Sequence, residues 1–600
     1  MIMQKHIFLL AALAVMASSC GQRTFGGLSF DVEGIGEDRA FIAEMIDSRV
    51  KERIGECPGR TFKVVFTIDS TITGENAKVR VCSGKAEIKA SRTRGLIFGA
   101  GRLLHSMSFS EKGFSIACGN YDFTPKSSSR CCYMARHFNT WYQRAPKAEM
   151  LRYIDDMFLW GINTLNTQLG MATVNYDYST EAERAEFDDV TDAVCRRISQ
   201  CDMELRTGGG TNVARKGFPS EFKAAPLDPP RGDDSWNVCP SKPGALEYLL
   251  ANRETALKKY AAKGYPITHM SYFPYDEGGC QCEECAPWGG NGYVKTFTAM
   301  HELNQKYFPG VRETVSTWFF DDKDYEGLFK YLETQDWIDY LEIDSHSDFP
   351  RYPLEHAIPK NIPVTTFPEI SMWGRCPWGG YGATPLPGRF ERLFRQVEKI
   401  AGGFRLYSEG LYEDINKVVI SRIYSDPSLT SADVLEEYAR YELPGIDTEE
   451  FKEFIGILEA NHCTGSPAGE RRKDFNFLVF LRDADPDTLA LRQTRAARAL
   501  ALAEKMDGEL LPSMKNCWRW RQLLLRARID NEIFTSRKLR TEVADRCYEE
   551  LVTMYHAEAQ KKRLLEHHKD GYTLPPYYPP VQMPAYEDSG IYDNYEDTGV

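Results

Sequence analysis

The chain has 600 residues, 42% of them hydrophobic, which is too much material for one ordinary core and predicts roughly three domains. The formal net charge is −13, and the sequence holds no basic cluster that could neutralise phosphates. This composition excludes a disordered chain and argues against nucleic acid as a partner.

The N-terminus has the pattern of an export signal. Lys5 and His6 precede an apolar run over residues 7–16, and small residues from Ala17 lead to Cys20. This ending resembles a bacterial lipobox, which implies that residues 1–19 are removed and that Cys20 carries a lipid. The alternative is a short membrane anchor, but the run is about half the ~20 residues that a spanning helix needs. We therefore expect an exported protein, lipid-anchored to a bacterial membrane in the periplasm or at the cell surface.

Residues 20–122 are predicted to form an N-terminal α+β accessory domain. Phe62–Ile68 and Val79–Cys82 have strand patterns, and Thr93–Leu104 has apolar residues at helical spacing. The part Arg94–Leu104 resembles the helix of the N-terminal accessory domain shared by family 20 β-N-acetylhexosaminidases and family 67 α-glucuronidases. In both families that domain precedes a barrel, so the resemblance implies a barrel here.

Residues 123–425 repeat a rhythm of strand, polar or Gly-rich turn and helix. Eight runs have strand character: Cys131–His137, Thr164–Gln168, Met203–Thr207, Ile267–Phe273, Glu313–Trp318, Tyr340–Ile343, Val364–Phe367 and Phe404–Tyr407. The segment Pro146–Trp160 has the apolar spacing of a helix packed on a sheet. Eight such units predict a (β/α)8 TIM barrel.

Residues 426–570 change to a helical pattern, which predicts a C-terminal all-helical domain. Asp447–Glu450 has the form of a capping box, and Asp485 followed by Pro486 is a helix start. The longest predicted helices cover Asp487–Met506 and Trp518–Leu539. Residues 571–600 are rich in Pro, Tyr and acidic residues and are predicted to be an extended tail.

Carboxylates follow four of the eight predicted strands, where barrel enzymes place catalytic groups. They are Asp276 and Glu277 after the fourth, Glu342 and Asp344 at the sixth, Glu369 after the seventh and Glu409 after the eighth. Glycoside hydrolysis needs one carboxylic acid to protonate the leaving oxygen and a second group to activate water or attack carbon. The alternative is that such carboxylates cap helices or pair with nearby arginines.

The placement of these carboxylates resembles family 67 α-glucuronidases. That resemblance implies Glu277 as the acid and Asp344 with Glu369 as the pair that activates water. We therefore expect the wide separation between catalytic carboxyl groups that is typical of an inverting enzyme. The adjacent Asp276 and Glu277 also resemble family 20 enzymes, in which the Asp orients the substrate's own N-acetyl group. The segment Tyr407–Lys417 and the Cys-rich loop are closest to uncharacterised bacterial proteins near these families.

Aromatic and arginine side chains at strand ends are candidates for substrate binding. Trp288 and Trp378 each lie on a Gly-bracketed turn, and Trp318 and Trp373 lie at two further strand ends. Such rings suit stacking on sugar rings, although packing at the barrel rim is the alternative. The remaining candidates are Arg136, His137, Arg206, Arg375 and Glu409. An Arg fork fits the carboxylate of a uronic acid, or it can hold the catalytic carboxylates ionised.

Three cysteines, Cys280, Cys282 and Cys285, lie within six positions beside the predicted acid. Zinc could use them with a fourth ligand such as Cys376; a local disulfide and free thiols are the alternatives. With Cys20 lipidated, an odd number of the 16 cysteines remains, so at least one is unpaired or binds something. No cofactor is predicted apart from this structural metal.

Together these features predict an exo-acting glycoside hydrolase that acts on oligo- or polysaccharides by carboxylate general acid/base catalysis, with uronic acid residues as one class of product. The alternatives are a substrate-assisted β-N-acetylhexosaminidase and a non-catalytic glycan-binding lipoprotein.

Overall fold

The computed structural model describes residues 23–136, 140–171, 179–214, 218–226, 237–274, 278–345, 349–368, 370, 382–462, 485–538 and 541–556. The chain divides into two compact units. The first comprises the described residues up to Thr124 with Glu437–Thr448 and Gly508–Cys517. The second comprises Pro125–Glu436, Glu449–Asp507 and the described residues from Trp518 onward.

The first unit contains a five-stranded sheet of order β1-β2-β4-β3-β7, in which β3 runs antiparallel to β4 and β7. Its strands are β1 (Gly27–Asp31), β2 (Thr61–Ile68), β3 (Ala77–Cys82), β4 (Lys85–Ala90) and β7 (Gly119–Asn120). Two helices, α2 (Phe41–Ile54) and α3 (Thr93–His105), and a hairpin of β5 (Ser108–Ser110) and β6 (Gly113–Ser115) complete the N-terminal part. A Cβ at Gly99 would lie 2.7 Å from Ile88, so glycine there lets α3 pack closely on β4. The predicted α+β fold is confirmed.

The second unit is built on a closed barrel of eight parallel strands. They are β8 (Ser129–Met134), β9 (Thr164–Thr167), β10 (Glu204–Gly210), β11 (Ile267–Phe273), β12 (Arg312–Ser316), β13 (Tyr340–Asp344), β14 (Val364–Phe367) and β15 (Ala401–Ser408). Neighbours pair in sequence order, and β15 closes the barrel against β8. Each strand overlaps one of the eight predicted runs, so the TIM barrel is confirmed.

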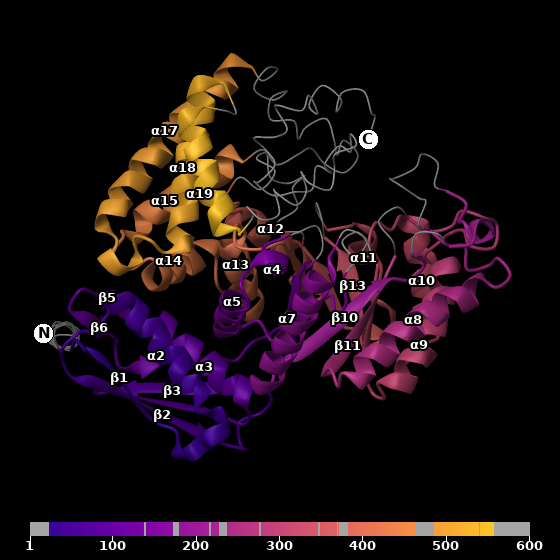
Figure 1. Ribbon diagram of the computed structural model, residues 1–600, viewed down its shortest axis with the longest axis horizontal. Coiled ribbons are helices and arrows are strands. Elements are labelled where there is room, and N and C mark those ends of the chain that lie inside the picture. The colour runs from indigo at the N-terminus through magenta and orange to yellow at the C-terminus, as the bar shows by residue number, and fades with distance from the viewer. Residues whose placement is uncertain are drawn as a thin grey trace, which may run out of the picture. The chain divides into compact units, whose positions relative to one another are not determined.

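Helices follow the barrel strands and lie outside them, as Figure 1 shows for α8 and α9 beside β10 and β11. They are α4 (Trp141–Arg144), α5 (Lys147–Leu159), α7 (Glu181–Gln200), α8 (Ala245–Ala262), α9 (Gly292–Tyr307), α10 (Asp322–Leu332), α11 (Tyr352–Glu355), α12 (Pro387–Val397) and α13 (Asp414–Ser425). Thr180 with Glu183, and Asp321 with Asp324, form capping boxes that satisfy free N–H groups at the starts of α7 and α10.

The C-terminal region is helical, as predicted. Its helices are α14 (Ser431–Glu442), α15 (Thr448–Asn461), α17 (Pro486–Glu509), α18 (Trp518–Ser536) and α19 (Glu542–Met554). Asp485 caps α17 by accepting the Thr488 N–H at 2.8 Å, which confirms the predicted helix start. Among the described residues, no helix combines the length and apolar character that crossing a bilayer requires.

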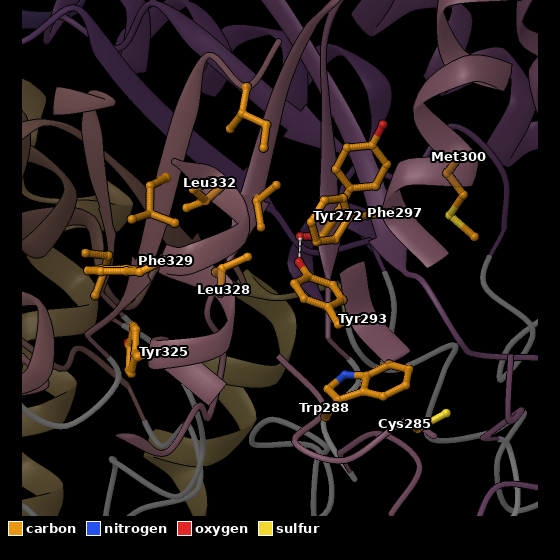
Figure 2. Packing of buried hydrophobic residues seen from close by; sticks show 14 of the residues in the cluster. Tyr272, Cys285, Trp288, Tyr293, Phe297, Met300, Tyr325, Leu328, Phe329 and Leu332 are labelled. Carbon is orange, nitrogen blue, oxygen red and sulfur yellow. Dashed lines mark hydrogen bonds between the residues drawn. The ribbon is translucent and has the colours of Figure 1, made fainter. Parts of the chain in front are cut away.

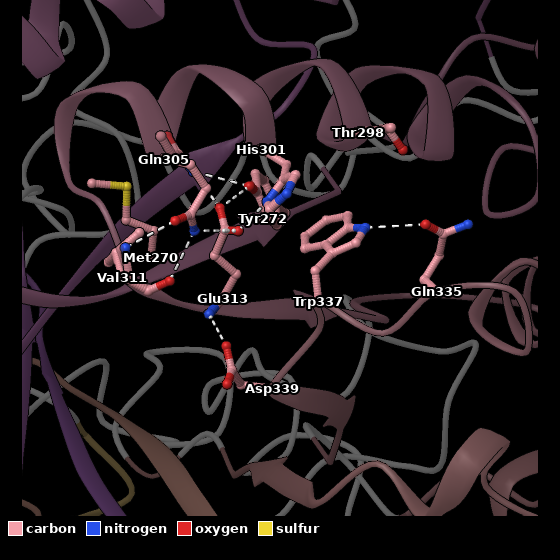
Figure 3. A network of polar contacts seen from close by, with 12 residues as sticks. Met270, Tyr272, Thr298, His301, Gln305, Val311, Glu313, Gln335, Trp337 and Asp339 are labelled. Carbon is pink, nitrogen blue, oxygen red and sulfur yellow. Dashed lines mark hydrogen bonds and ion pairs between the residues drawn. The ribbon is translucent and has the colours of Figure 1, made fainter.

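A buried polar network supports the barrel near the amino-terminal ends of β12 and β13 (Figure 3). The fully buried Glu313 carboxylate accepts hydrogen bonds from Tyr272 Oη and from Gln305 Nε2 at 3.1 Å, and it contacts His301 Nδ1. The Glu313 N–H donates to Asp339 Oδ2 at 2.7 Å. Because active sites of TIM barrels lie at the opposite end of the strands, this satisfied carboxylate has a structural role.

Candidate active site

A cluster of aromatic side chains covers the barrel interior at the carboxyl ends of the strands. Phe273 and Phe367 are the last residues of β11 and β14, and Trp318 follows β12. The Trp318 ring lies 5.4 Å from Phe273 and 5.1 Å from Phe367, centroid to centroid. We call this cluster the aromatic floor: Tyr133, Phe273, Trp318, Phe319, Phe367 and Tyr407. Tyr133, Phe273 and Phe319 remain partly exposed, so the floor offers apolar surface of the kind that lines sugar and ligand sites.

A buried ion network lies against this floor. Glu342 of β13 accepts two bonds from Arg405 of β15, at 2.7 and 2.6 Å, and one from Arg206 of β10 at 2.6 Å. The Arg405 guanidinium also lies 4.2 Å from the centre of the Phe367 ring. Burial raises the pKa of Glu342, but the two arginines outweigh it and hold that pKa below its usual range. Glu342 is therefore an ionised, fully paired carboxylate and cannot act as a catalytic acid.

Of the two carboxylates predicted to activate water, Asp344 is the one that the structure describes, and it lies at the barrel mouth. It is the last residue of β13 and is partly exposed. Since side chains two apart on a strand share a face, Asp344 points to the barrel interior like Glu342, but one layer higher. The Phe319 N–H donates to Asp344 Oδ2 at 3.3 Å, which ties this carboxylate to the edge of the aromatic floor.

Glu409 lies just beyond β15, on a turn that Glu413 holds in place. Glu413 Oε1 accepts the N–H groups of Glu409 and Gly410, each at 2.7 Å. Tyr407 Oη donates to Glu409 Oε1 at 3.0 Å, so the floor and this carboxyl group are in direct contact. Burial and the nearby Glu413 raise the pKa of Glu409 to about 8, while the Tyr407 bond acts in the other direction. A carboxyl group in this state is protonated at neutral pH and can donate a proton or a hydrogen bond.

Two arginines predicted to bind substrate are engaged elsewhere. Arg206 forms an ion pair with Glu342, which agrees with the alternative that arginines hold carboxylates ionised. Arg136 Nη1 donates to Thr191 Oγ1 at 2.6 Å, and its guanidinium lies 3.8 Å from the centre of the Phe187 ring. Thr191 and Phe187 belong to α7, outside the barrel, so Arg136 does not face the mouth. The prediction that these two residues bind a sugar carboxylate is therefore corrected.

The two described tryptophans from the predicted sugar-binding set are buried. Trp288 is 3% exposed and packs beside Tyr293 in the core between barrel and helices (Figure 2). Gly279 and Gly292 leave room for its ring, and an indole this deeply buried cannot stack on a sugar. Trp318 is 5% exposed and belongs to the aromatic floor, where it supports more exposed rings. For both residues the packing alternative is the correct one.

Several predicted residues lie outside the described part of the chain. They are Asp276 and Glu277 after β11, Glu369, Trp373, Arg375 and Trp378 after β14, His137 after β8, and Cys20. The described neighbours Pro274 and Gly278 bracket the Asp276–Glu277 pair directly after the carboxyl end of β11. Their catalytic assignments remain predictions.

Sequence patterns did not single out Tyr133, Gln168, Tyr407 and Cys239. Gln168 Nε2 donates to Tyr133 Oη at 2.7 Å, which adds polar groups to the rim of the aromatic floor. Alternation along the strand could have found Tyr407, because it lies between Arg405 and Glu409 at two-residue spacing. Cys239 carried no such signal; it joins Cys280, Cys282 and Cys285 in a cluster next to this site.

The second unit thus has a TIM-barrel fold, with carboxyl groups at the carboxyl ends of its parallel strands. No protein-family model matches the sequence, and no curated protein is similar to it. Solved structures do match, at 10–12% identity, which establishes a shared fold.

Three of these structures are glycoside hydrolases from three different families. A family 138 enzyme targeting pectin rhamnogalacturonan II matches with a TM-score of 0.54 and 11% identity, over 92% of this chain and 75% of its own. A family 115 4-O-methyl-α-glucuronidase with specificity for decorated arabinogalactans matches with a TM-score of 0.55 and 10% identity, over 93% of this chain and 79% of its own. A family 89 enzyme from Clostridium perfringens, in complex with GlcNAc-α-1,4-galactose, matches with a TM-score of 0.55 and 12% identity, over 88% of this chain and 65% of its own. The particular closeness to families 67 and 20 expected from the sequence is not supported.

Proposed function

We propose that this protein is an exo-acting glycoside hydrolase. The observation that carries the proposal is the pair of carboxyl groups at the barrel mouth, Asp344 and Glu409, which both contact the aromatic floor. Glycoside hydrolysis requires carboxyl groups in two protonation states on either side of one bond. The raised pKa of Glu409 supplies a group that is neutral at pH 7, and Asp344 lies at the end of a different strand, β13.

The roles proposed for the reaction combine these residues with the predicted acid. Glu277 follows β11 in the sequence, and Glu409 follows β15. These two strands lie four positions apart around the eight-stranded barrel, so they end on opposite sides of the mouth. We assign proton donation to the leaving oxygen to Glu277 and activation of water to Asp344 with Glu369. Neutral Glu409 donates a hydrogen bond to a sugar hydroxyl. This assignment implies inversion at the anomeric carbon.

The substrate class proposed first is a glycan ending in a uronic acid. The engagement of Arg136 and Arg206 elsewhere removes part of the support for it, and the remaining support is Arg375 with the fold shared by a family 115 glucuronidase. A substrate with an N-acetyl group is the second candidate. It is favoured by the adjacency of Asp276 and Glu277 and by the fold shared with a family 89 enzyme bound to a GlcNAc-containing sugar.

The deciding experiment is a screen of aryl glycosides of uronic acids and N-acetylhexosamines, followed by kinetics of Glu277→Gln and Asp344→Asn on any substrate found. We expect each variant to lower kcat at least roughly a hundredfold with substrate binding retained. Glu355→Gln is the matched control, because Glu355 is an exposed residue of α11 paired with Arg351. Proton NMR of the first-formed product should show inversion.

Three results would count against the proposal. Binding of glycans without turnover by the unmodified protein would favour the glycan-binding alternative. Near-normal turnover by Glu277→Gln on a substrate with a poor leaving group would remove Glu277 as the acid. Retention of the anomer, together with a requirement for an N-acetyl group, would transfer the second role from Asp344 and Glu369 to Asp276.

A further inference from the structure

Four cysteine side chains converge beside the barrel mouth. Cys239 comes from the segment between β10 and α8, and Cys280, Cys282 and Cys285 come from the segment between β11 and α9. All four sulfur atoms lie within 4.8 Å of one another. Cys239, Cys280 and Cys285 are buried, whereas Cys282 is partly exposed, so one corner of the group is open to solvent.

The spacing of the sulfurs is that of a metal tetrahedron. Four thiolates about 2.3 Å from a central zinc ion would stand about 3.8 Å apart along each edge. Cys239 Sγ lies 3.8 Å from Cys282 Sγ and 3.9 Å from Cys285 Sγ. A disulfide would require a sulfur separation of about 2 Å, and all four cysteines are free thiols in this structure.

A backbone N–H group and a hydroxyl group lie against the sulfurs. The Ala225 N–H donates to Cys280 Sγ at 3.3 Å. Donors of this kind orient metal ligands and offset the negative charge of a four-thiolate centre.

Side-chain contacts extend this surrounding layer. Ser241 Oγ lies 3.3 Å from Cys285 Sγ, and Lys295 Nζ donates to the same Ser241 Oγ at 3.4 Å. The Lys295 ammonium group is thus linked to the cluster through the Ser241 hydroxyl. Four bare thiolates so close together would repel one another, and a divalent cation at their centre removes that repulsion.

We propose that Cys239, Cys280, Cys282 and Cys285 bind one structural zinc ion. A closed set of four sulfur ligands suits zinc and leaves no open position for substrate. The fourth ligand is therefore Cys239, in place of Cys376, which lies outside the described residues.

The zinc site joins the two loops that border the predicted acid. Gln281 N–H donates to Ala225 O at 3.0 Å, and Asn237 Nδ2 donates to Gly278 O at 3.1 Å, so the same two segments are already tied by hydrogen bonds. Gly278 directly follows Glu277. On the proposed hydrolase function, the four cysteines act as positioning residues, because the metal anchors the chain three residues after the acid.

The test begins with the unmodified protein, purified without chelator and under reducing conditions. Elemental analysis should find about one zinc ion per chain, and replacement by Co²⁺ should give the absorption bands of a tetrahedral cobalt–thiolate centre. Cys239→Ser should lower zinc occupancy at least about tenfold when the protein is dialysed against a weak chelator. Cys547→Ser, which changes another buried cysteine outside the cluster, should retain the metal.

The outcomes separate this proposal from its rivals. Zinc-free protein with four reactive thiols, or peptides joined by a disulfide within the cluster, would overturn it. A red protein containing iron would overturn the assignment of the metal, and full zinc retention by Cys239→Ser would overturn the ligand set. Because metal content is measured without substrate, it does not depend on the proposed hydrolase activity; loss of kcat on zinc removal with KM unchanged would support the positioning role.

Discussion

At the scale of single residues, Glu342 and Glu409 show how environment separates two carboxyl groups near the same barrel mouth. Glu342 lies between Arg405 and Arg206, which keep it ionised. Glu409 has a second carboxylate, Glu413, beside it and little solvent, and its pKa rises to about 8. The first residue therefore holds the barrel interior in place, and the second can donate a proton.

Glu409→Gln should flatten the dependence of stability on pH. In the folded protein the pKa of Glu409 is about 8, above the ordinary value of 4.5, so between these pH values the folded state binds more protons than the unfolded state. Stability must then fall as pH rises through this window, and glutamine, which does not titrate, removes that loss. Melting temperatures of the variant and the unmodified protein, measured from pH 5 to about pH 9, will check this.

The matched control for this measurement is Glu355→Gln, at an exposed ion pair, which should keep the original slope. Parallel melting curves for Glu409→Gln and the unmodified protein would show that Glu409 titrates normally and is ionised at neutral pH. In that case its proposed role as a neutral hydrogen-bond donor would have to be abandoned.

At the scale of elements, the loop between β11 and α9 depends on glycines that admit the Trp288 ring. A Cβ at Gly279 would lie 1.8 Å from Trp288 Cδ2, and one at Gly292 would lie 2.3 Å from Trp288 Cζ3. The same loop carries Cys280, Cys282 and Cys285. The indole therefore forms the packed base of the loop that carries these cysteines.

Gly279→Ala should displace the Trp288 ring and destabilise the loop. Overpacking of this kind costs about 1–3 kcal/mol, and the rigid indole is buried and cannot move aside. We expect a lower midpoint of denaturant unfolding and a changed tryptophan emission spectrum. Gly209→Ala in β10 is the control, because a Cβ there meets no atom within 4 Å; equal effects of both substitutions would refute this account of the loop.

At the scale of the whole molecule, the helical region is joined to the barrel within the second unit. Arg519 of α18 is buried and donates to Asp414 Oδ2 of α13 at 2.9 Å and to Asp156 Oδ2 of α5 at 3.2 Å. Tyr153 Oη of α5 donates to Asp414 Oδ1 at 2.8 Å. The barrel helices α5 and α13 thus depend on a cation that lies 363 residues beyond Asp156 and 105 residues beyond Asp414 in the chain.

Arg519→Met should destabilise the second unit by about 3 kcal/mol, because it removes a buried cation from the buried Asp414 and the partly exposed Asp156. For the same reason, a chain ending at residue 430 should fail to give a stable barrel. The measurements are denaturant unfolding of the variant and circular dichroism of the shortened chain. Arg498→Met, at the exposed pair with Glu453, should change stability by less than about 1 kcal/mol. A shortened chain that melts like the full protein would show that the barrel folds independently.

The first unit shows the same dependence on distant segments. Arg53 of α2 is buried, and its Nη2 bonds Glu442 Oε2 at 2.6 Å while its Nε donates to Tyr441 O at 2.6 Å. Ser513 Oγ donates to the Arg53 carbonyl. Residues 437–448 and 508–517 therefore complete a unit whose sheet is built from the first 124 residues.

The sequence by itself determined the barrel, its eight strands and the carboxyl groups that follow them. These features depend on local properties: runs of β-forming residues, the helical spacing between them, and the turn residues that end each strand. Ile267–Phe273 and Val364–Phe367 were predicted with the bounds that the structure has. The three clustered cysteines beside Glu277 were likewise visible as a motif.

Only the tertiary structure decided which side chains meet. Arg206 was a candidate for a sugar carboxylate until Glu342, 136 residues away, was found to bind it. Trp288 was a candidate platform until its ring was found buried against Gly279 and Gly292. Cys239 joined the other cysteines across 43 residues. Such pairings follow from barrel closure and loop folding, which bring distant segments together, and spacing along the chain does not encode where a side chain points.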